Sequence, residues 1–518
     1  MKFIMKKTLA LLALLLSVFS LYAQDPNIFW QRTIGGSDRD TPTFIISTTD
    51  QGFFIGGPSK SNISGEKTEN SRGGYDYWAL KFDSSGNIEW QKTIGGDQDD
   101  RLADAKQTPD GGYILVGSSA SNLSGDKTEN SRGGADYWII KLDATGNIIW
   151  QRTLGGDAND RANEVELTYD GNYLIGGTSN SSISGDRTVS NNGYPDAWIL
   201  KLDESGNIIW QRGHQFLVNF FLGALKITND GGYIIGGTSG SNESYSFMKL
   251  DANGNTIWEK YYGGDGWDAF THLILTSDGG YMAIGFSDSD ASGDKTDDSK
   301  GGPDYWILKL DANGAIEWQK TIGGDDGDDP SGIIQAPDGG YFIVGYSYSN
   351  ISGDKTENNV GENDFWIMKL NNVGIIEWQN TIGGAYSERL PKVIINTDGS
   401  ITIAGECNSD ISGDKTENSR GSNDFWVIKH AAILGLEENP FATAITLYPN
   451  PTKNTLQLNT QDKTINQVNI YTMTGSKVLQ LDVETVSPTV DVSSLAAGVY
   501  YVQLYSGKNV ALKKFIKE

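Results

Sequence analysis

The chain has 518 residues, too many for one hydrophobic core and enough for two or three domains. Its net charge of -25 repels phosphate backbones, so nucleic acid is not expected as a partner. The single cysteine, Cys407, excludes an internal disulfide framework and cysteine-rich metal knuckles, while 64 glycines and 11% aromatic residues favour short strands and tight turns.

The N-terminus has the pattern of a secretory signal peptide. Three lysines, Lys2, Lys6 and Lys7, precede the apolar run Thr8–Phe19. This order predicts a signal peptide over residues 1–23, cleaved near Ala23. The apolar run is too short for a stable membrane span, so no transmembrane segment is expected in the mature chain.

Two tryptophan positions recur along the chain and reveal an internal repeat. The first position is occupied at Trp30, 90, 150, 210, 258, 318 and 378, and the second at Trp78, 138, 198, 306, 366 and 426. Successive copies are 60 residues apart, except that the fourth is 12 residues short and has Ser246 at the second position. Only Trp267 falls outside the pattern. Both positions lie inside strand patterns, which favours packing over sugar binding for the repeated indoles.

Each copy contains four strand signals separated by turn residues. In the second copy the expected strands are 101–108, 113–118, 136–142 and 148–154, with an Asp-Gly turn after the first and a long polar loop after the second. Four antiparallel strands repeated seven times predict an all-β, seven-bladed β-propeller over residues 24–436.

The ends of the repeat region predict how the ring closes. An isolated strand, 27–34, matches the fourth strand of a copy, and the last copy stops after its third strand, 424–430. The N-terminal strand would therefore complete the last blade and remove two free sheet edges. The turn from Asp143 to Gly146, followed by Trp150, also resembles quinoprotein-type propeller repeats. That turn is one residue shorter here, so the resemblance supports the architecture alone.

The composition changes after an acidic linker at 437–446, and the periodic tryptophans stop. The motifs that follow are Leu-Tyr-Pro-Asn-Pro-Thr (447–452), Val-Asn-Ile-Tyr (468–471), Asp-Val-Ser-Ser-Leu-Ala-Ala-Gly-Val-Tyr-Tyr-Val (491–502) and Lys-Lys-Phe-Ile-Lys (513–517). Residues 447–518 thereby resemble the type A C-terminal sorting domain of the Bacteroidetes type IX secretion system. Their alternating pattern predicts a small β-sandwich. The resemblance implies handling by the type IX machinery and an extracellular or outer-membrane-surface location.

No catalytic motif stands out in the propeller region. Phosphate loops and Gly-x-Ser-x-Gly elbows are absent, and His214, His272 and His430 have no motif around them. We therefore expect an exported binding scaffold that recognises a glycan or another extracellular protein through its acidic loop face. A polysaccharide-active enzyme resembling a glycoside hydrolase is the alternative, since a pair of carboxylates cannot be singled out among so many.

Calcium is the one cofactor that the loop composition suggests. Long loops lie between the fourth and first strands and between the second and third strands, so they share one face of the ring. Carboxylates from the two loop types could supply the oxygens that Ca²⁺ requires, namely Asp97, Asp99, Asp100, Asp126 and Glu129. Alternatively, these carboxylates cap turns and pair with Lys127 and Arg101.

The short fourth copy predicts a ligand site where the repeat symmetry breaks. Its missing loop would open a notch beside residues that depart from the consensus, namely His214, Phe220, Tyr262, Trp267 and Asp268. An exposed indole beside carboxylates suits sugar stacking combined with hydrogen bonds to hydroxyls. The alternative is that these aromatic residues refill the volume left by the missing loop.

Overall fold

The computed structural model describes residues 27–191, 193–214, 219–240, 244–431, 445–460, 462–472, 477–506 and 509–518. The predicted signal peptide and most of the predicted linker lie outside these residues. The chain divides into two compact units, 1–431 and 432–518. No helix in the described part of the chain is long and apolar enough to cross a bilayer.

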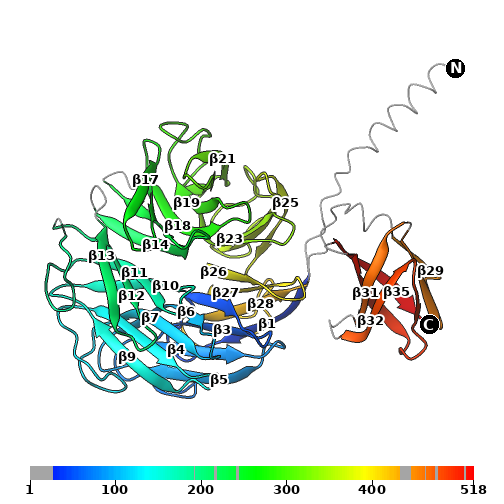
Figure 1. The fold of residues 1–518 in the computed structure, drawn as a ribbon, viewed down its shortest axis with the longest axis horizontal. Coiled ribbons are helices and arrows are strands. Elements are labelled where there is room, and N and C mark those ends of the chain that lie inside the picture. Colours follow the sequence, from blue (N-terminus) through cyan, green and yellow to red (C-terminus); the bar gives the residue numbers. More distant parts are fainter. Residues whose placement is uncertain are drawn as a thin grey trace. The chain divides into compact units, whose positions relative to one another are not determined.

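The first unit is a ring of seven four-stranded antiparallel sheets, which confirms the predicted propeller (Figure 1). Blade 1 contains β2 (Phe44–Ser47), β3 (Phe53–Ser59), β4 (Asp76–Phe82) and β5 (Ile88–Ile94), and blade 2 contains β6 (Asp100–Gln107), β7 (Tyr113–Ser119), β8 (Asp136–Leu142) and β9 (Ile148–Leu154). Blade 3 contains β10 (Asp160–Leu167), β11 (Tyr173–Ser179), β12 (Asp196–Leu202) and β13 (Ile208–His214). Blade 4 contains β14 (Phe220–Ile227), β15 (Tyr233–Ser239), β16 (Ser244–Leu250) and β17 (Thr256–Tyr262).

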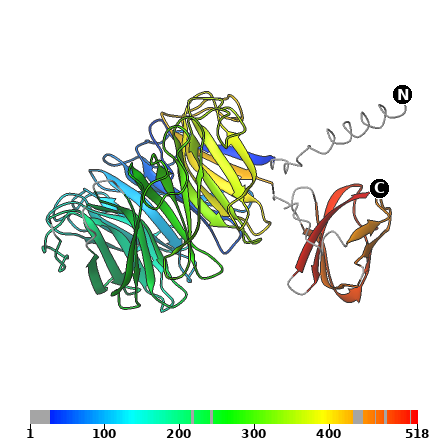
Figure 2. The same cartoon turned by 90° about the horizontal axis from the view of Figure 1, so that it is seen from above.

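The remaining blades follow the same order. Blade 5 contains β18 (Asp268–Leu275), β19 (Tyr281–Ser287), β20 (Asp304–Leu310) and β21 (Ile316–Ile322). Blade 6 contains β22 (Asp328–Gln335), β23 (Tyr341–Ser347), β24 (Asp364–Leu370) and β25 (Ile376–Ile382). Blade 7 contains β26 (Glu388–Ile395), β27 (Ile401–Cys407), β28 (Asp424–His430) and, from the other end of the unit, β1 (Ile28–Ile34). Figure 2 shows the same blades from the side of the ring.

Strand β1 closes the ring by pairing with β28, as the split repeat predicts. Gln31 lies opposite Ile428 in the antiparallel register. The Gln31 side chain accepts a hydrogen bond from Trp426 Nε1 at 3.0 Å, and Lys415 Nζ donates to Thr33 Oγ1 at 2.5 Å. The outer strand therefore completes the Trp–Gln contact that blades 1, 2, 3, 5 and 6 make within one repeat.

The hydrophobic core lies between neighbouring blades rather than within any one of them. Trp138 of blade 2 is fully buried against Tyr77 of blade 1, with ring centroids 5.0 Å apart. The Tyr77 hydroxyl also donates to Trp138 O at 3.1 Å. Each interblade layer is built from both sides in this way, so a single blade cannot bury its own apolar surface.

The other repeated indole fixes the turn of the next blade. Trp90 Nε1 donates to Ala144 O at 3.1 Å, in the turn between β8 and β9. Gly146 in that turn has a φ of 85°, and a Cβ there would lie 2.9 Å from the Trp90 ring. Glycine is therefore required both for the backbone conformation and for the close approach of the indole.

The second unit contains two sheets. One has the order β29 (Thr446–Tyr448), β30 (Thr455–Asn459), β33 (Thr489–Asp491), and the other has the order β32 (Lys477–Val486), β31 (Thr464–Thr472), β34 (Gly498–Ser506), β35 (Asn509–Lys517). Buried residues of both sheets, including Leu456, Ile470 and Val502, form one core. This is the small β-sandwich expected from the sequence.

Candidate functional site

The long loops of each blade are joined to one another on one face of the ring, which we call the loop face. In blade 2 the backbone N–H groups of Asp97 and Gln98 donate to the hydroxyls of Ser124 and Ser121 at 3.0 and 2.9 Å. At the opposite ends of the strands, Lys141 pairs with Asp110 of the tight turn at 2.9 Å. The loop face thus offers the longer and more variable surface.

The five carboxylates proposed for calcium are all engaged by protein groups. Asp97 accepts from Ser124 Oγ, Asp99 pairs with Arg101, Asp100 accepts from Ser121 Oγ, Asp126 pairs with Arg72, and Glu129 accepts from Thr153 N, at distances of 2.7–2.9 Å. No group of three or more such side chains is arranged to hold a metal ion in the described part of the chain. Calcium binding stays a prediction of the sequence alone.

A ring of buried charges runs through the blades beneath the loop face. Each blade except the fourth carries a carboxylate at or just before the start of its first strand, a cation in its long loop and a carboxylate at the start of its third strand. The carboxylates are Asp40, Asp76, Asp100, Asp136, Asp160, Asp196, Asp268, Asp304, Asp328, Asp364, Glu388 and Asp424, and the cations are Lys67, Lys127, Arg187, Lys295, Lys355 and Lys415. Two buried carboxylates therefore share each cation.

Blade 2 shows how serine hydroxyls hold this ring together. Lys127 Nζ donates to Ser119 Oγ at 2.7 Å and to Ser131 Oγ at 2.9 Å, and it lies 5.8 Å from the centre of the Trp138 ring. Burial lowers the pKa of Lys127 to about 8, although Asp100 and Asp136 oppose that shift. The amine is thus held by neutral hydroxyls and an aromatic face between two acids.

Carboxylates of adjacent blades face each other at the junctions. Burial raises the pKa of Asp136 to about 6, and the charge of Asp160 in the next blade adds to that rise. Between blades 6 and 7, burial raises the pKa of Asp364 to about 7, and a hydrogen bond with Glu388 adds to the rise. Two buried acids that face each other cannot both ionise without a cost in free energy. A junction therefore favours the form in which one of the two acids retains its proton.

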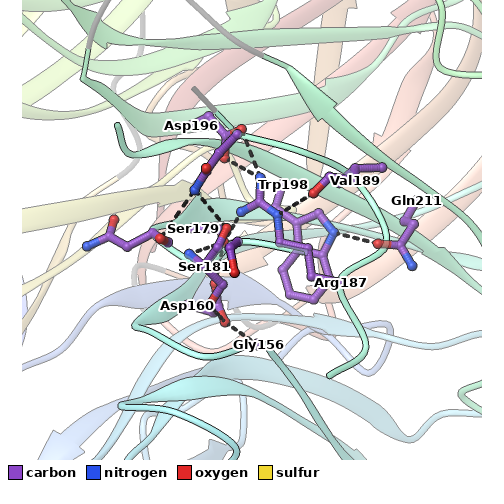
Figure 3. A network of polar contacts seen from close by, with 12 residues as sticks. Gly156, Asp160, Ser179, Ser181, Arg187, Val189, Asp196, Trp198 and Gln211 are labelled. Carbon is purple, nitrogen blue, oxygen red and sulfur yellow. Dashed lines mark hydrogen bonds and ion pairs between the residues drawn. The ribbon is translucent and has the colours of Figure 1, made fainter. Parts of the chain in front are cut away.

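The junction between blades 3 and 4 lacks the second acid and is rebuilt around an arginine (Figure 3). Phe220 occupies the position of Asp100, and the loop cation is Arg187 instead of lysine. The guanidinium donates to both Asp196 oxygens, at 2.7 and 2.8 Å, and also bonds Ser179. Because Phe220 cannot share a proton with Asp196, a bidentate cation pairs with that acid instead, although burial still raises the pKa of Asp196 to about 6.

These charges predict an unusual pH dependence of stability. Burial raises the folded-state pKa values of Asp76, Asp136 and Asp424 to about 6 and those of Asp304 and Asp364 to about 7, against about 3.9 for unfolded aspartate. The protonated form favours the folded state, so this stabilisation is complete near pH 4 and is lost as the pH rises through 6 to 7. Thermal unfolding should therefore give a higher Tm at about pH 5 than at about pH 7.5. A Tm that rises steadily between these values would contradict the shared-proton interpretation.

An aromatic groove opens on the loop face between blades 5 and 6. It has a volume of about 510 Å³ and is lined by Trp267, Phe286, Pro303, Asp326, Gly327, Asp329, Tyr346 and Tyr348. Trp267 precedes β18, is 43% exposed, and makes an edge-to-face contact with Phe286 at 4.8 Å. Its backbone N–H donates to Asp288 Oδ1 at 2.5 Å, which fixes the loop that carries the indole. No other tryptophan of the described residues is so exposed.

Of the five residues predicted to form a ligand site, only Trp267 lines this groove. Asp268 is buried in the charge ring, where Gly264 N donates to it at 2.6 Å. Phe220 is fully buried in the interblade core. His214 and Tyr262 are the last residues of β13 and β17, the position that Leu154 has in β9. The His214 side chain is buried there, and Tyr262 is half-buried against the interblade core. These four side chains fill structural positions of the repeat and do not meet Trp267 in the groove, so their part in ligand binding stays a prediction of the sequence.

The groove residues that the sequence reasoning missed come from a different repeat position. The sixth residue of the second strand is Ser118 in blade 2 and Thr178 in blade 3, but Phe286 in blade 5 and Tyr346 in blade 6. Aligning the copies at this position would have placed two aromatic residues beside Trp267. The prediction instead followed the short fourth copy and placed the site at the junction of blades 4 and 5, next to the junction that forms the groove.

A second polar cluster lies on the innermost strands of blades 2 to 4. Lys226 Nζ pairs with Glu164 at 2.9 Å and with Glu166 at 3.0 Å, and Lys106 Nζ pairs with Asp104 at 3.0 Å. Backbone groups complete the set, since Val165 N donates to Asp104 at 3.1 Å. Three acids and two amines thus pair with one another, which is the pattern of a structural network.

Comparison with known proteins identifies the second unit. The family model described as the secretion system C-terminal sorting domain matches residues 446–518. These residues are a type IX sorting tail, and they imply an extracellular or cell-surface protein. A regulatory protein FlaEY of Caulobacter vibrioides is 24% identical over 153 residues, which are 29% of this chain and 16% of that protein. The match thus spans about a sixth of that relative's length.

Solved structures similar to the chain include other propellers at low identity. The Pan2 WD40 domain of Neurospora crassa is 12% identical, with a TM-score of 0.43 over 79% of this chain and 97% of that one. A structure of YCF48 bound to D1 peptide is 10% identical, with a TM-score of 0.42 over 80% and 99% of the two chains. A Dyadobacter fermentans protein of unknown function is 12% identical, with a TM-score of 0.40 over 78% and 98%.

Proposed function

We propose that this secreted propeller is a carbohydrate-binding scaffold and that the groove around Trp267 is its glycan site. The observation that carries the proposal is an exposed indole set in an open groove with three further aromatic rings and two carboxylates. Sugar C–H faces stack on indole and phenol rings, and carboxylates accept hydrogen bonds from sugar hydroxyls. The repeated indoles are buried or half-buried, and none of them is as exposed as Trp267.

The position of the groove also supports a binding role. It lies among loops that interblade contacts hold in place, since Asp325 N and Asp326 N donate to Ser352 Oγ and Ser349 Oγ at 2.9 and 3.0 Å. Such a preorganised surface loses little conformational entropy when a ligand binds. The sorting tail places the groove outside the cell, where polysaccharides and surface proteins are available.

A hydrolase is the alternative function, and a panel of soluble and insoluble glycans tests it. Asp326 and Asp329 both line the groove, but Asp329 is hydrogen-bonded to Tyr346 and lies near Arg389. Release of reducing ends from any bound polysaccharide would make these two carboxylates the first candidates for an acid and base pair. Binding without release supports the scaffold.

The decisive variant is Trp267→Ala. On a panel of soluble and insoluble glycans, it should weaken binding at least about fivefold, because each stacked ring contributes about 1 kcal/mol or more. Its Tm should change little, because the indole is 43% exposed. Affinity is measured by isothermal titration for soluble ligands and by sedimentation for insoluble ones.

Tyr169→Ala is the matched control. Tyr169 is 77% exposed and lies in the turn between β10 and β11, at the opposite face of the ring from the groove. It should retain full affinity. Unchanged glycan binding in Trp267→Ala, or a loss of several degrees in its Tm with affinity intact, would remove the groove from consideration.

A further inference from the structure

The groove of the proposed glycan site is acidic as well as aromatic. Its lining includes Asp326 and Asp329 and contains no lysine or arginine. Asp326 is exposed, and its Oδ1 accepts from Gly327 N at 2.8 Å. The hydrogen bonds that Asp326 makes with the described residues are with Gly327 N, at its carboxylate, and with Ser349 Oγ, at its backbone, and no ion pair with a described cation is among them. A ligand that enters the groove therefore meets one carboxylate that the protein leaves without a counter-ion.

The other carboxylate of the groove already has partners. Asp329 is hydrogen-bonded to Tyr346, and Arg389 is its electrostatic partner. The Arg389 guanidinium lies 5.9 Å from the centre of the Tyr348 ring and also acts on the buried carboxylate of Glu406. Glu406 is paired with Arg39 at 2.8 Å, so Arg389 acts mainly on Asp329, and the remaining charge of the lining is the negative charge of Asp326.

More carboxylates lie in the loops that carry the groove residues, and hydrogen bonds hold them in place. Asp288 accepts from Trp267 N, Asp265 accepts from Ser292 Oγ at 2.8 Å, and Asp325 accepts from Ser352 Oγ at 2.7 Å. All three are exposed. Such a field raises the local concentration of cations and repels anions before any contact is made.

Aromatic rings and an unpaired carboxylate together are the chemistry that recognises an ammonium group. The faces of Trp267, Tyr346 and Tyr348 carry negative electrostatic potential and attract cations, and Asp326 supplies a full charge and a hydrogen-bond acceptor. A neutral sugar uses only the stacking surface. An acidic sugar stacks equally well but is repelled by the carboxylates.

We infer that the groove selects glycans that carry free ammonium groups, as in glucosamine oligomers without N-acetyl groups, over neutral or acidic glycans. This inference rests on the proposed function, because it assumes that the occupant of the groove is a sugar. The ammonium group lies near Asp326, and the sugar ring stacks on Trp267. Acetylation of the amine removes both the positive charge and the ion pair with Asp326.

The test compares three oligosaccharides of equal length by isothermal titration with the full chain. They are a glucosamine oligomer, its fully N-acetylated counterpart and a galacturonic acid oligomer, at about pH 5.5, where the sugar amine is charged. We expect the glucosamine oligomer to bind at least tenfold more tightly than the acetylated one, and the uronic acid not to bind. The preference should shrink as salt is raised, because exposed charges are screened.

Asp326→Asn isolates the charge, and Asp325→Asn is its matched control. The first variant should lose the preference for glucosamine while keeping its affinity for the acetylated oligomer. The second removes the neighbouring carboxylate, which bonds Ser352 outside the groove lining, and should keep most of the preference. Trp267→Ala should lose both ligands.

The outcomes separate the two proposals. Equal affinity for the charged and acetylated oligomers, or tighter binding of the uronic acid, would overturn the ammonium inference while the glycan site stands. Failure of every oligosaccharide and of the wider glycan panel would overturn the proposed function itself. Binding of a lysine-rich peptide without any sugar would also overturn it and assign the groove to a protein partner.

Discussion

Deleting residues 27–36, which contain β1, should lower the Tm of the propeller by on the order of 10 °C or prevent folding. The deletion exposes the edge of β28 and leaves Trp426 Nε1 without its partner Gln31. It also removes the buried side chain of Ile34, whose loss alone costs about 1.5–3 kcal/mol. Scanning calorimetry of the purified chain measures the change, and a deletion that melts like the full protein would contradict ring closure.

Removal of the second unit is the control for that deletion. A chain truncated after residue 431 retains every propeller strand, including the β1–β28 pair. Its propeller transition should stay within a few degrees of that of the full chain. The comparison separates the loss of the closing strand from any general effect of shortening the protein.

Lys127→Met should be the most damaging point substitution in the charge ring, costing about 3–5 kcal/mol at neutral pH. It removes the cation that Asp100 and Asp136 share and leaves both acids buried without a counter-charge. The hydroxyls of Ser119 and Ser131 also lose their donor. Chemical unfolding at about pH 7.5 measures the cost, which should shrink at about pH 5 as the acids take up protons.

Asp136→Asn is the informative companion variant. It removes the acid whose pKa is raised to about 6, so it should be neutral or stabilising at about pH 7.5 and should flatten the dependence of Tm on pH. The amide can still accept from Arg132 N, which bonds Asp136 at 2.6 Å in the native chain. Equal destabilisation by both substitutions would show that the ring carries no excess negative charge.

The fold was predictable from the sequence because the repeat exposes its own boundaries. The third and fourth strands of the second copy begin and end at the expected residues, and the first begins one residue early, at Asp100. Asp-Gly turns and the regular tryptophan spacing fix the strand order. The split repeat fixes the closure, since only one arrangement pairs both ends.

The groove was only partly predictable, because its walls come from two blades. Trp267 stood out as the non-repeat indole, but Tyr346 and Tyr348 lie about 80 residues away and meet it only across the junction. The burial of the carboxylates in the charge ring was also not predictable from the sequence. Asp100 and Asp268 sit in polar loops in the sequence, yet both head a strand and point into the interblade layer.

The charge ring also determines which segments of this protein can be duplicated or exchanged without loss of stability. Except where blade 4 takes part, each junction pairs an acid at the start of one blade's third strand with an acid at the first strand of the next blade, so a repeat carries one half of each of two pairs. Placing blade 4 after blade 1 would set Phe220 against Asp76, beside a lysine and without the arginine that serves Asp196. Duplication or shuffling of whole repeats therefore succeeds only where the charged residues of the inserted repeat match those of its new neighbours. The interchangeable module is the junction rather than the blade.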